Sequence, residues 1–301
     1  MTATSNTLPS GGSPTTTHPP SRLGVAIRNG WRQATIELLT SIRGGQVISY
    51  LITPAVAIGF ILWGGDSPIE GTGITMAQYV VPSLLAMTLV VGGILGPSGE
   101  LMMEREDGSI VRMKAVPGGL QGYVFGKVFS VLTVNIVSLA LVFVVAAIFL
   151  PSLVPASAGA WLRFVLFVVL GLLASVPVGI ALGSAIKNAA LLMIPMFLIY
   201  GLLVISGIFF PIEAFAAPVQ WIAMVFPLYW LGLGLRSVFL PPEAASLELA
   251  GTWQTVESVM ALGIWAVLGM VLAPILLRRM VRGVSGSTVT EARERMLSRG
   301  Y

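Results

Sequence analysis

The stretch VFSVLTVNIVSLALVFVVAAIFL, residues 128–150, decides the fold, because it is apolar throughout and contains no charged residue. A helix needs roughly 20 such residues to cross about 30 Å of hydrocarbon. Five further uncharged apolar stretches occur, at 46–63, 79–96, 164–186, 189–210 and 258–277. A soluble helical domain is disfavoured, because too little polar chain remains to cover six such helices. The sequence therefore predicts an all-α membrane protein with six transmembrane helices.

The composition agrees with that class and argues against several kinds of function. Of 301 residues, 55% are hydrophobic and only 10% are charged. The six stretches contain no Asp, Glu, His, Lys or Arg, whereas an intramembrane enzyme or an ion-coupled secondary transporter usually carries ionisable groups at membrane depth. The chain has no cysteine, and its only histidine, His18, lies in a polar N-terminal segment. No metal site or acid/base centre is therefore expected.

The distribution of basic residues predicts the orientation. All but two of the 17 Lys and Arg residues fall in the N-terminal flank, the second and fourth connections and the C-terminal tail. The other two, Arg163 and Arg236, lie in the odd-numbered connections, where several acidic residues cluster. By the positive-inside rule, both termini are expected in the cytoplasm and the protein in the cell membrane. The basic character thus reflects topology, and no nucleic-acid partner is expected.

Four segments are predicted along the chain. Residues 1–20 are rich in Thr, Ser, Pro and Gly and are expected to form a disordered cytoplasmic tail. Residues 21–43 carry apolar side chains at helical spacing beside arginines, which predicts an interfacial helix. The transmembrane domain is expected at 44–282 and a cytoplasmic tail at 283–301.

The second connection, GELMMEREDGSIVRMKAVPGGLQGYVFGK at 99–127, is the most polar part of the chain. Both charge signs and apolar residues share one short segment before Pro and Gly, which favours docking against another protein over a simple solvated loop. Its end resembles a phosphate-binding loop but lacks the first Gly, at Gln121, and the Ser or Thr, at Val128. Nucleotide binding by this chain is therefore not expected.

The fifth connection, 211–257, begins PIEAFAAPVQWIAMVFPLYWLGLGLR. It is apolar and aromatic but contains three prolines and a glutamate in that run, which favours short re-entrant or interfacial helices. A seventh membrane helix at about 221–240 is the alternative, but it would place the basic C-terminal tail outside.

Over about 21–282 the chain resembles the permease subunits of ABC-2-type exporters, in particular drug and antibiotic exporters of the daunorubicin-resistance type. Two segments carry the resemblance. MEREDGSIVRMKAVPGGLQGYVFGK is similar to the family pattern E-R-E-x-G…P…G-K, and the segment at 206–236 to S-G-x-x-F-P…P…R. The resemblance implies an elbow helix at 21–43, a coupling helix at about 107–117, and re-entrant helices between spans five and six.

The resemblance also implies partners and site residues. Two copies of a separate ABC ATPase, which would bind ATP and Mg, and a second permease chain, identical or different, would complete the transporter. The expected contacts to the ATPase are Glu104, Arg105, Glu106, Gly108, Arg112 and Lys114. A substrate path would be lined by Met87, Thr88, Asn135, Tyr200, Ser206 and Phe209, although ordinary packing explains each of these as well.

Expected cargo follows from the uncharged spans, which can hold apolar and aromatic groups but desolvate a charged polymer only at high cost. Hydrophobic or amphipathic drugs or lipids are the first choice, and polysaccharide or glycolipid the second. A secondary transporter or a non-transporting membrane scaffold remains the alternative from another class. Two small-residue motifs, Gly92-x-x-x-Gly96 and Gly179-x-x-x-Gly183, fit either packing within the chain or a dimer interface.

Overall fold

The structure is a computed structural model that describes residues 47–64, 67–106, 108–110, 119–186 and 189–283. The predicted interfacial helix at 21–43, the tail at 1–20 and the tail beyond Gly283 lie outside the described residues, as do Arg112 and Lys114.

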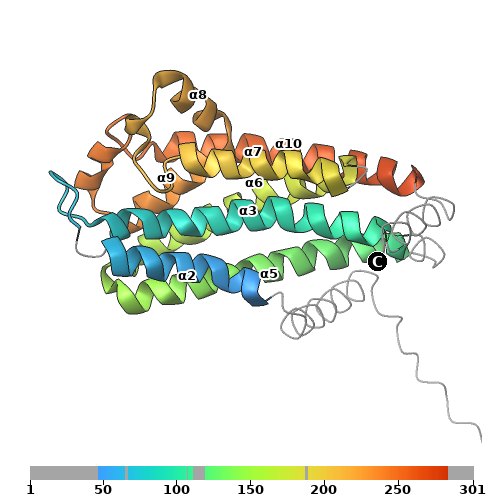
Figure 1. Cartoon of the computed structure of the whole chain (residues 1–301), viewed down its shortest axis with the longest axis horizontal. Coiled ribbons are helices and arrows are strands. Elements are labelled where there is room, and N and C mark those ends of the chain that lie inside the picture. Colours follow the sequence, from blue (N-terminus) through green and yellow to red (C-terminus); the bar gives the residue numbers. More distant parts are fainter. Residues whose placement is uncertain (1–46, 65–66, 107, 111–118, 187–188, 284–301) are drawn as a thin grey trace, which may run out of the picture.

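Helices occupy every stretch from which a span was predicted (Figure 1). The long helices are α2 (Val47–Gly64), α3 (Met76–Glu106), α5 (Gly119–Phe149), α6 (Ala158–Ala185), α7 (Ala189–Ile205) and α10 (Thr255–Gly283). Shorter elements are η1 (Pro151–Leu153), η2 (Ile212–Ala214), α8 (Ala217–Val225), α9 (Pro227–Phe239) and η3 (Pro242–Leu247). Apart from an isolated bridge between Pro68 and Thr75, the regular structure of the described residues is helical.

Among the described residues, four helices are long and apolar enough to cross a membrane, and the count reaches five if the bent pair α8–α9 is one span. The four are Met76–Arg105, Lys127–Phe149, Ala158–Ala185 and Thr255–Gly283. The apolar parts of α2 and α7 are shorter, Ile52–Trp63 and Ala190–Ile205, so six crossings and the orientation stay predictions. The chain is a multi-pass helical membrane protein.

The predicted alternative of a seventh membrane helix at about 221–240 is not one uninterrupted helix, and a crossing by this segment stays a prediction. The chain bends by 87° between α8 and α9, so the segment is a broken span or a re-entrant pair. Pro227 begins α9 and has no backbone N–H with which to continue the ladder of α8. Phe226 between the two helices is extended.

Two helix ends differ from the predicted spans for local reasons. α7 ends at Ile205, five residues before the predicted limit at 210, because Gly207 adopts φ +73° and Pro211 follows. α3 continues past the predicted limit at 96 to Glu106, through Pro97.

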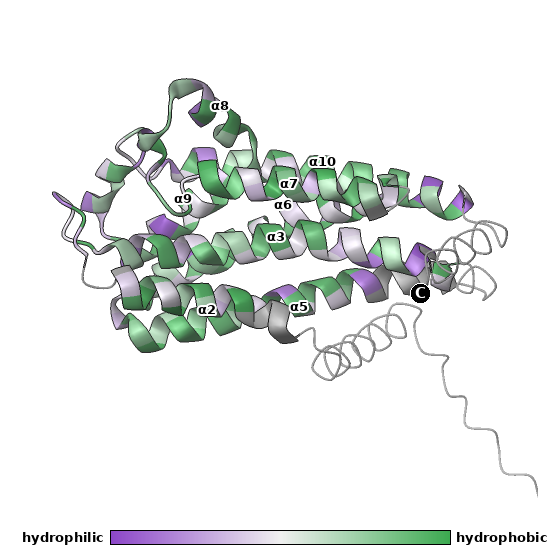
Figure 2. Ribbon diagram, in the orientation of Figure 1, coloured by the Kyte–Doolittle hydropathy of each residue, from purple (hydrophilic) through white to green (hydrophobic). Residues whose placement is uncertain are grey.

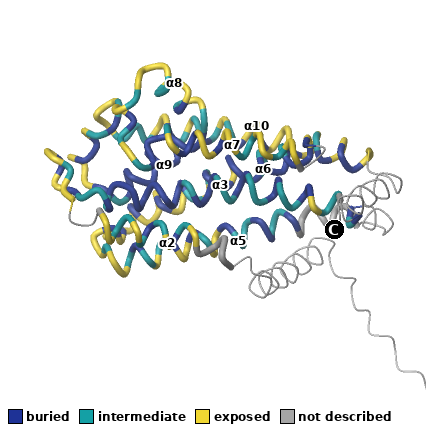
Figure 3. Tube along the Cα trace, viewed as in Figure 1, coloured by how far each residue is buried: buried dark blue, intermediate teal, exposed yellow. Residues whose placement is uncertain are grey.

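Helix α3 lies at the centre of the bundle, between α2 and α5 on one side and α6, α7 and α9 on the other (Figures 1 and 3). Of its most apolar stretch 72% is buried, against 22% for α10. The outer helices instead expose large apolar side chains, such as Ile148, Leu162, Phe197 and Val267. Hydrophilic residues are concentrated near the helix ends (Figure 2), as expected for helices that cross hydrocarbon.

A seam of small residues joins α3 to α6. A Cβ added to Gly179 would lie 2.5 Å from the carbonyl oxygen of Gly93, and one added to Gly183 would lie 2.7 Å from the Cα of Ser98. Pro97 has no N–H to donate to that Gly93 carbonyl, so the oxygen is free to face α6. The Ser98 hydroxyl donates across the seam to the carbonyl oxygen of Gly179, at 2.9 Å.

The Gly179-x-x-x-Gly183 motif therefore packs within the chain. The motif Gly92-x-x-x-Gly96 does not bring the backbone of α3 close to the backbone of another helix. Gly92 faces the side chain of Asn135 on α5, and a Cβ on Gly96 would meet no heavy atom within 4 Å.

Candidate functional site

A charged cluster at one end of the bundle joins α3 to α5. Lys127, only 4% exposed, forms ion pairs with Glu100 and Glu104, and its ammonium nitrogen lies 2.9 Å from Oε1 of Glu104. The two glutamates are four residues apart on α3 and so lie on one face of the helix. A single buried cation thus neutralises part of the charge of two carboxylates.

Arg105 joins the same end of α3 to α6. Its guanidinium donates to the carbonyl oxygens of Ile186 and of Ser184, the latter at 3.0 Å. These carbonyls belong to the last turn of α6, where helix oxygens lack intrahelical partners and carry partial negative charge. The three helices α3, α5 and α6 are therefore tied together where the polar second connection leaves α3.

The predicted contacts to an ATPase fall partly at this cluster. Glu104 and Arg105 have partners inside the chain, Glu106 ends α3, and Gly108 adopts φ +75°. A role in docking stays a prediction for all six residues. Reversing the charge of Glu104 would, however, disturb the pair with Lys127 as well as any docking.

We expect Lys127→Met to lower the stability of the folded chain by about 1–2 kcal/mol, because two partly screened carboxylates lose their shared cation. Thermal unfolding of the detergent-solubilised chain measures this. Arg278→Met, at an exposed position on α10, is the control and should change stability by less than about 0.5 kcal/mol. Equal effects of the two changes would show that the cluster contributes no more than any surface charge.

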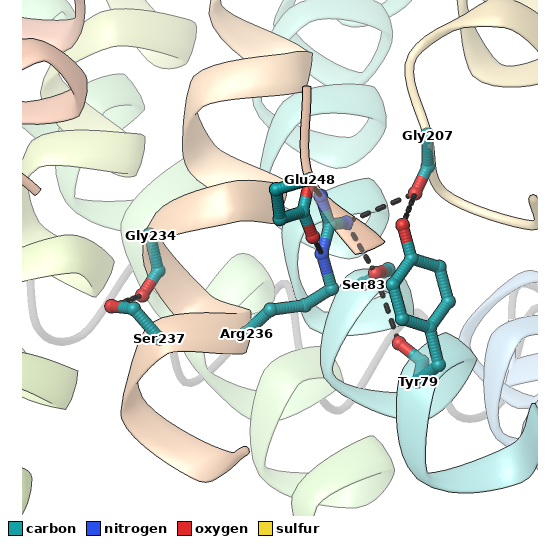
Figure 4. A network of polar contacts seen from close by, with 7 residues as sticks. All are labelled: Tyr79, Ser83, Gly207, Gly234, Arg236, Ser237 and Glu248. Atoms are coloured by element: carbon teal, nitrogen blue, oxygen red, sulfur yellow. Dashed lines mark hydrogen bonds and ion pairs between the residues drawn. The ribbon is translucent and has the colours of Figure 1, made fainter. Parts of the chain in front are cut away.

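A second polar cluster lies near the start of α3, at the end away from Lys127, and centres on Arg236 of α9 (Figure 4). Its guanidinium forms a bidentate ion pair with Glu248, with Nε 2.6 Å from Oε1 and a terminal nitrogen 2.9 Å from Oε2. The other terminal nitrogen donates to Ser83 Oγ at 2.8 Å and to the Gly207 carbonyl at 2.9 Å. Arg236 and Glu248 are both fully buried.

The cluster joins four separate parts of the chain. Arg236 comes from α9, Glu248 follows η3, Ser83 lies on α3, and Gly207 follows α7. Tyr79 of α3 lies beneath the guanidinium, with its ring centroid 4.9 Å from Cζ. A buried ion pair is stable only with good geometry and further hydrogen bonds, and this one is bidentate and has both. The cluster therefore holds the α8–α9 region against α3.

Charged residues occur in the helices counted as candidate spans, although they lie outside the six predicted stretches. Arg236 lies in the bent pair that counts as a possible fifth span, and the candidate spans of α3 and α5 include Glu100, Glu104 and Lys127 at their ends. All of these charges are paired, which is how burial of charge becomes tolerable. The signal in the sequence was an Arg closing the apolar run LGLGLR.

The six residues of the predicted substrate path lie on α3, α5 and α7 and in the turn after α7. Thr88 and Ser206 are buried and donate their hydroxyls to the carbonyls of Leu84 and Leu202 in their own helices. Met87 and Phe209 pack against the core, and Tyr200 is 47% exposed on α7. Nothing in this arrangement assigns a path, which stays a prediction.

Asn135, the sixth of these residues, is buried on α5 and donates Nδ2–H to the Val131 carbonyl at 2.8 Å. Its Oδ1 has no hydrogen-bond partner among the described residues. This oxygen lies 2.6 Å from the position that a Cβ added to Gly92 would take. The bond is thus within its own helix, and the interhelical contact is steric. No group of three or more metal-ligating residues occurs in the described part of the chain.

An apolar helical bundle with a charged cluster near each end of α3 defines a multi-pass membrane protein. Residues 67–275 match the family described as ABC-2 family transporter protein, and that match spans more than half of the 301 residues. The chain belongs to this family and is the transmembrane, non-catalytic component of an ABC-2 type transporter. ABC-2 permeases generally pair with ABC ATPase subunits. Comparisons with curated proteins and with solved structures gave no match.

Proposed function

We propose that the chain is the permease subunit of an ATP-driven exporter that moves hydrophobic or amphipathic drugs or lipids out of the cell. The family match over 67–275 supports the transporter class, and the apolar middle of the bundle supports the cargo class. The drug-exporter subtype and both cytoplasmic termini belong to this proposal.

Energy would come from a separate ATPase that binds ATP and Mg. Two permease chains, identical or different, would stand over two ATPases, and the polar segment after α3 would rest on one of them. The ion pair of Lys127 and the hydrogen bonds of Arg105 support this arrangement. Because they connect the end of α3 to α5 and α6, a displacement of that segment would move the three helices together. The ATPase could shift the bundle between two arrangements only by binding one of them more tightly.

The test is reconstitution of the full chain, with its copurifying ATPase, in lipid vesicles. We expect no ATP hydrolysis by the chain alone, hydrolysis with the partner, and ATP-dependent movement of a fluorescent amphipathic dye. Hydrolysis by the isolated chain would contradict the need for a separate ATPase.

Cargo is tested separately, by deleting the gene. Increased sensitivity to amphipathic drugs is expected. Unchanged sensitivity together with loss of a surface polysaccharide would reverse the ranking and support the glycan alternative.

A further inference from the structure

Two polar side chains of α5 contact α3 at matching intervals. Lys127 forms an ion pair with Glu100, and Asn135 faces Gly92, where an added Cβ would stand 2.6 Å from the Asn135 Oδ1. Asn135 follows Lys127 by eight residues, and Glu100 follows Gly92 by the same number. The two helices are therefore antiparallel, and both contacts belong to one register of α5 on α3.

Equivalent contacts are available one helical turn further along α3. Glu104 lies four residues after Glu100, and Gly96 lies four residues after Gly92, so each pair shares a face of the helix. Lys127 already forms its second ion pair with Glu104, at 2.9 Å. A Cβ added to Gly96 would meet no heavy atom within 4 Å, so there is free space beside this glycine. A carboxylate and a small residue thus occur at both levels.

The packing around α5 is compatible with a shift to the second level. In the present register the Oδ1 of Asn135 is buried without a hydrogen-bond partner among the described residues, which is destabilising. After a shift of one turn, Leu139 would lie opposite Gly92, where the missing side chain leaves room for it. Helix α5 packs mainly against α3 and α2 and much less against α6, so the seam between α3 and α6 would stay intact.

We propose that α5 has two registers on α3 and moves between them by one helical turn, about 5 Å. In the second register Asn135 lies beside Gly96, and Lys127 pairs with Glu104 alone. Lys127 keeps a carboxylate partner throughout, so α5 stays attached to α3 while it moves. The movement takes place within this chain, and the proposal does not depend on the ATPase or on the cargo.

The test measures the distance between spin labels on α3 and α5 by pulsed electron paramagnetic resonance, with the full chain in lipid vesicles. The chain has no cysteine, so Met103→Cys and Ile148→Cys provide two unique label sites, and both native side chains are 67% exposed. The two sites lie toward opposite ends of the antiparallel pair, so their separation runs mainly along the helices. The second register brings Ile148 nearer to Met103 by about 5 Å.

Two isosteric variants bias the register in opposite directions. Glu100→Gln leaves Lys127 with Glu104, and we expect the ratio of short to long distances to rise about fivefold, the effect of one partly exposed ion pair. Glu104→Gln is the matched control and should lower this ratio or leave it unchanged. A ratio that does not rise in Glu100→Gln, or that rises equally in both variants, would overturn the proposal.

A second label pair tests whether the movement belongs to α5. Leu162, near the start of α6, is 72% exposed, and labels at Met103 and Leu162 report on α3 and α6. Their distance should stay constant, because the close approach of Gly179 to α3 and the bond from Ser98 to Gly179 hold α6 in place. A change of this distance alongside that of α5 would contradict a slide of α5 alone.

Disulfide formation keeps the test decisive should Glu100→Gln fail to fold. Gly92→Cys with Asn135→Cys should join in the present register. Gly96→Cys with Asn135→Cys should join only in the second register, because in the present one these positions are a helical turn out of level, beyond the roughly 7 Å that a disulfide spans between Cα atoms. Free thiols in the second pair, under conditions that oxidise the first, would overturn the proposal.

Discussion

Arg236→Met is expected to destabilise the folded chain by about 3–5 kcal/mol, because it leaves the Glu248 carboxylate buried without its cation. Three further groups lose a contact with the guanidinium, since Ser83 and the Gly207 carbonyl accept from it and the Tyr79 ring lies beneath it. The α8–α9 region should separate from α3 first. Thermal unfolding in detergent measures the loss, and limited proteolysis locates it.

Two variants separate charge from packing in this experiment. Arg236→Met with Glu248→Leu removes both charges and should recover most of the lost stability, because a well-packed apolar pair replaces a buried ion pair at little cost. Arg163→Met, at an exposed position at the start of α6, should be nearly neutral. A single variant Arg236→Met as stable as the unchanged chain would contradict the stabilising role of the guanidinium.

Gly179→Ala should be the other change with a large effect. The added Cβ would stand 2.5 Å from the Gly93 carbonyl oxygen and 2.6 Å from that of Ile94, and both are backbone atoms that cannot rotate away. Helices α3 and α6 would have to move apart, and overpacking of this kind costs about 3 kcal/mol. The lowered unfolding temperature of the purified chain is the measurement.

Gly96→Ala is the matched control, because Gly96 also stands in a small-residue motif but has open space around its Cβ position. It should leave stability unchanged or raise it slightly, since alanine is the better helix former. Equal losses at both positions would argue that glycine acts through helix flexibility and not through close packing.

Much of the helical layout could be predicted because it depends on local sequence. The stretch at 128–150 and its five counterparts were each found as helices, since a run of about 20 uncharged apolar residues needs no knowledge of its neighbours. The break between α8 and α9 was also foreseen, because Pro227 acts on its own backbone. The continuation of α3 to Glu106 was missed, because hydropathy falls there while the helix does not end.

The contacts of the charged residues and of the glycines were less predictable. The type of a residue in the sequence does not show which distant residue it will contact. Glu104 and Arg105 were expected to face an ATPase, and no pattern along the chain indicated that Lys127 and the end of α6 would pair with them.

By itself, then, the sequence determined that this is a multi-pass helical membrane protein with a polar segment after α3, because those properties are sums over neighbouring residues. Only the tertiary structure decided which polar groups meet. Arg236 and Ser83 are 153 residues apart, and Gly179 and Ser98 are 81 apart. Such pairs form because buried charges and hydroxyls must find partners, and close backbone approach is possible only where both helices lack side-chain bulk. Both conditions depend on how the helices pack against one another.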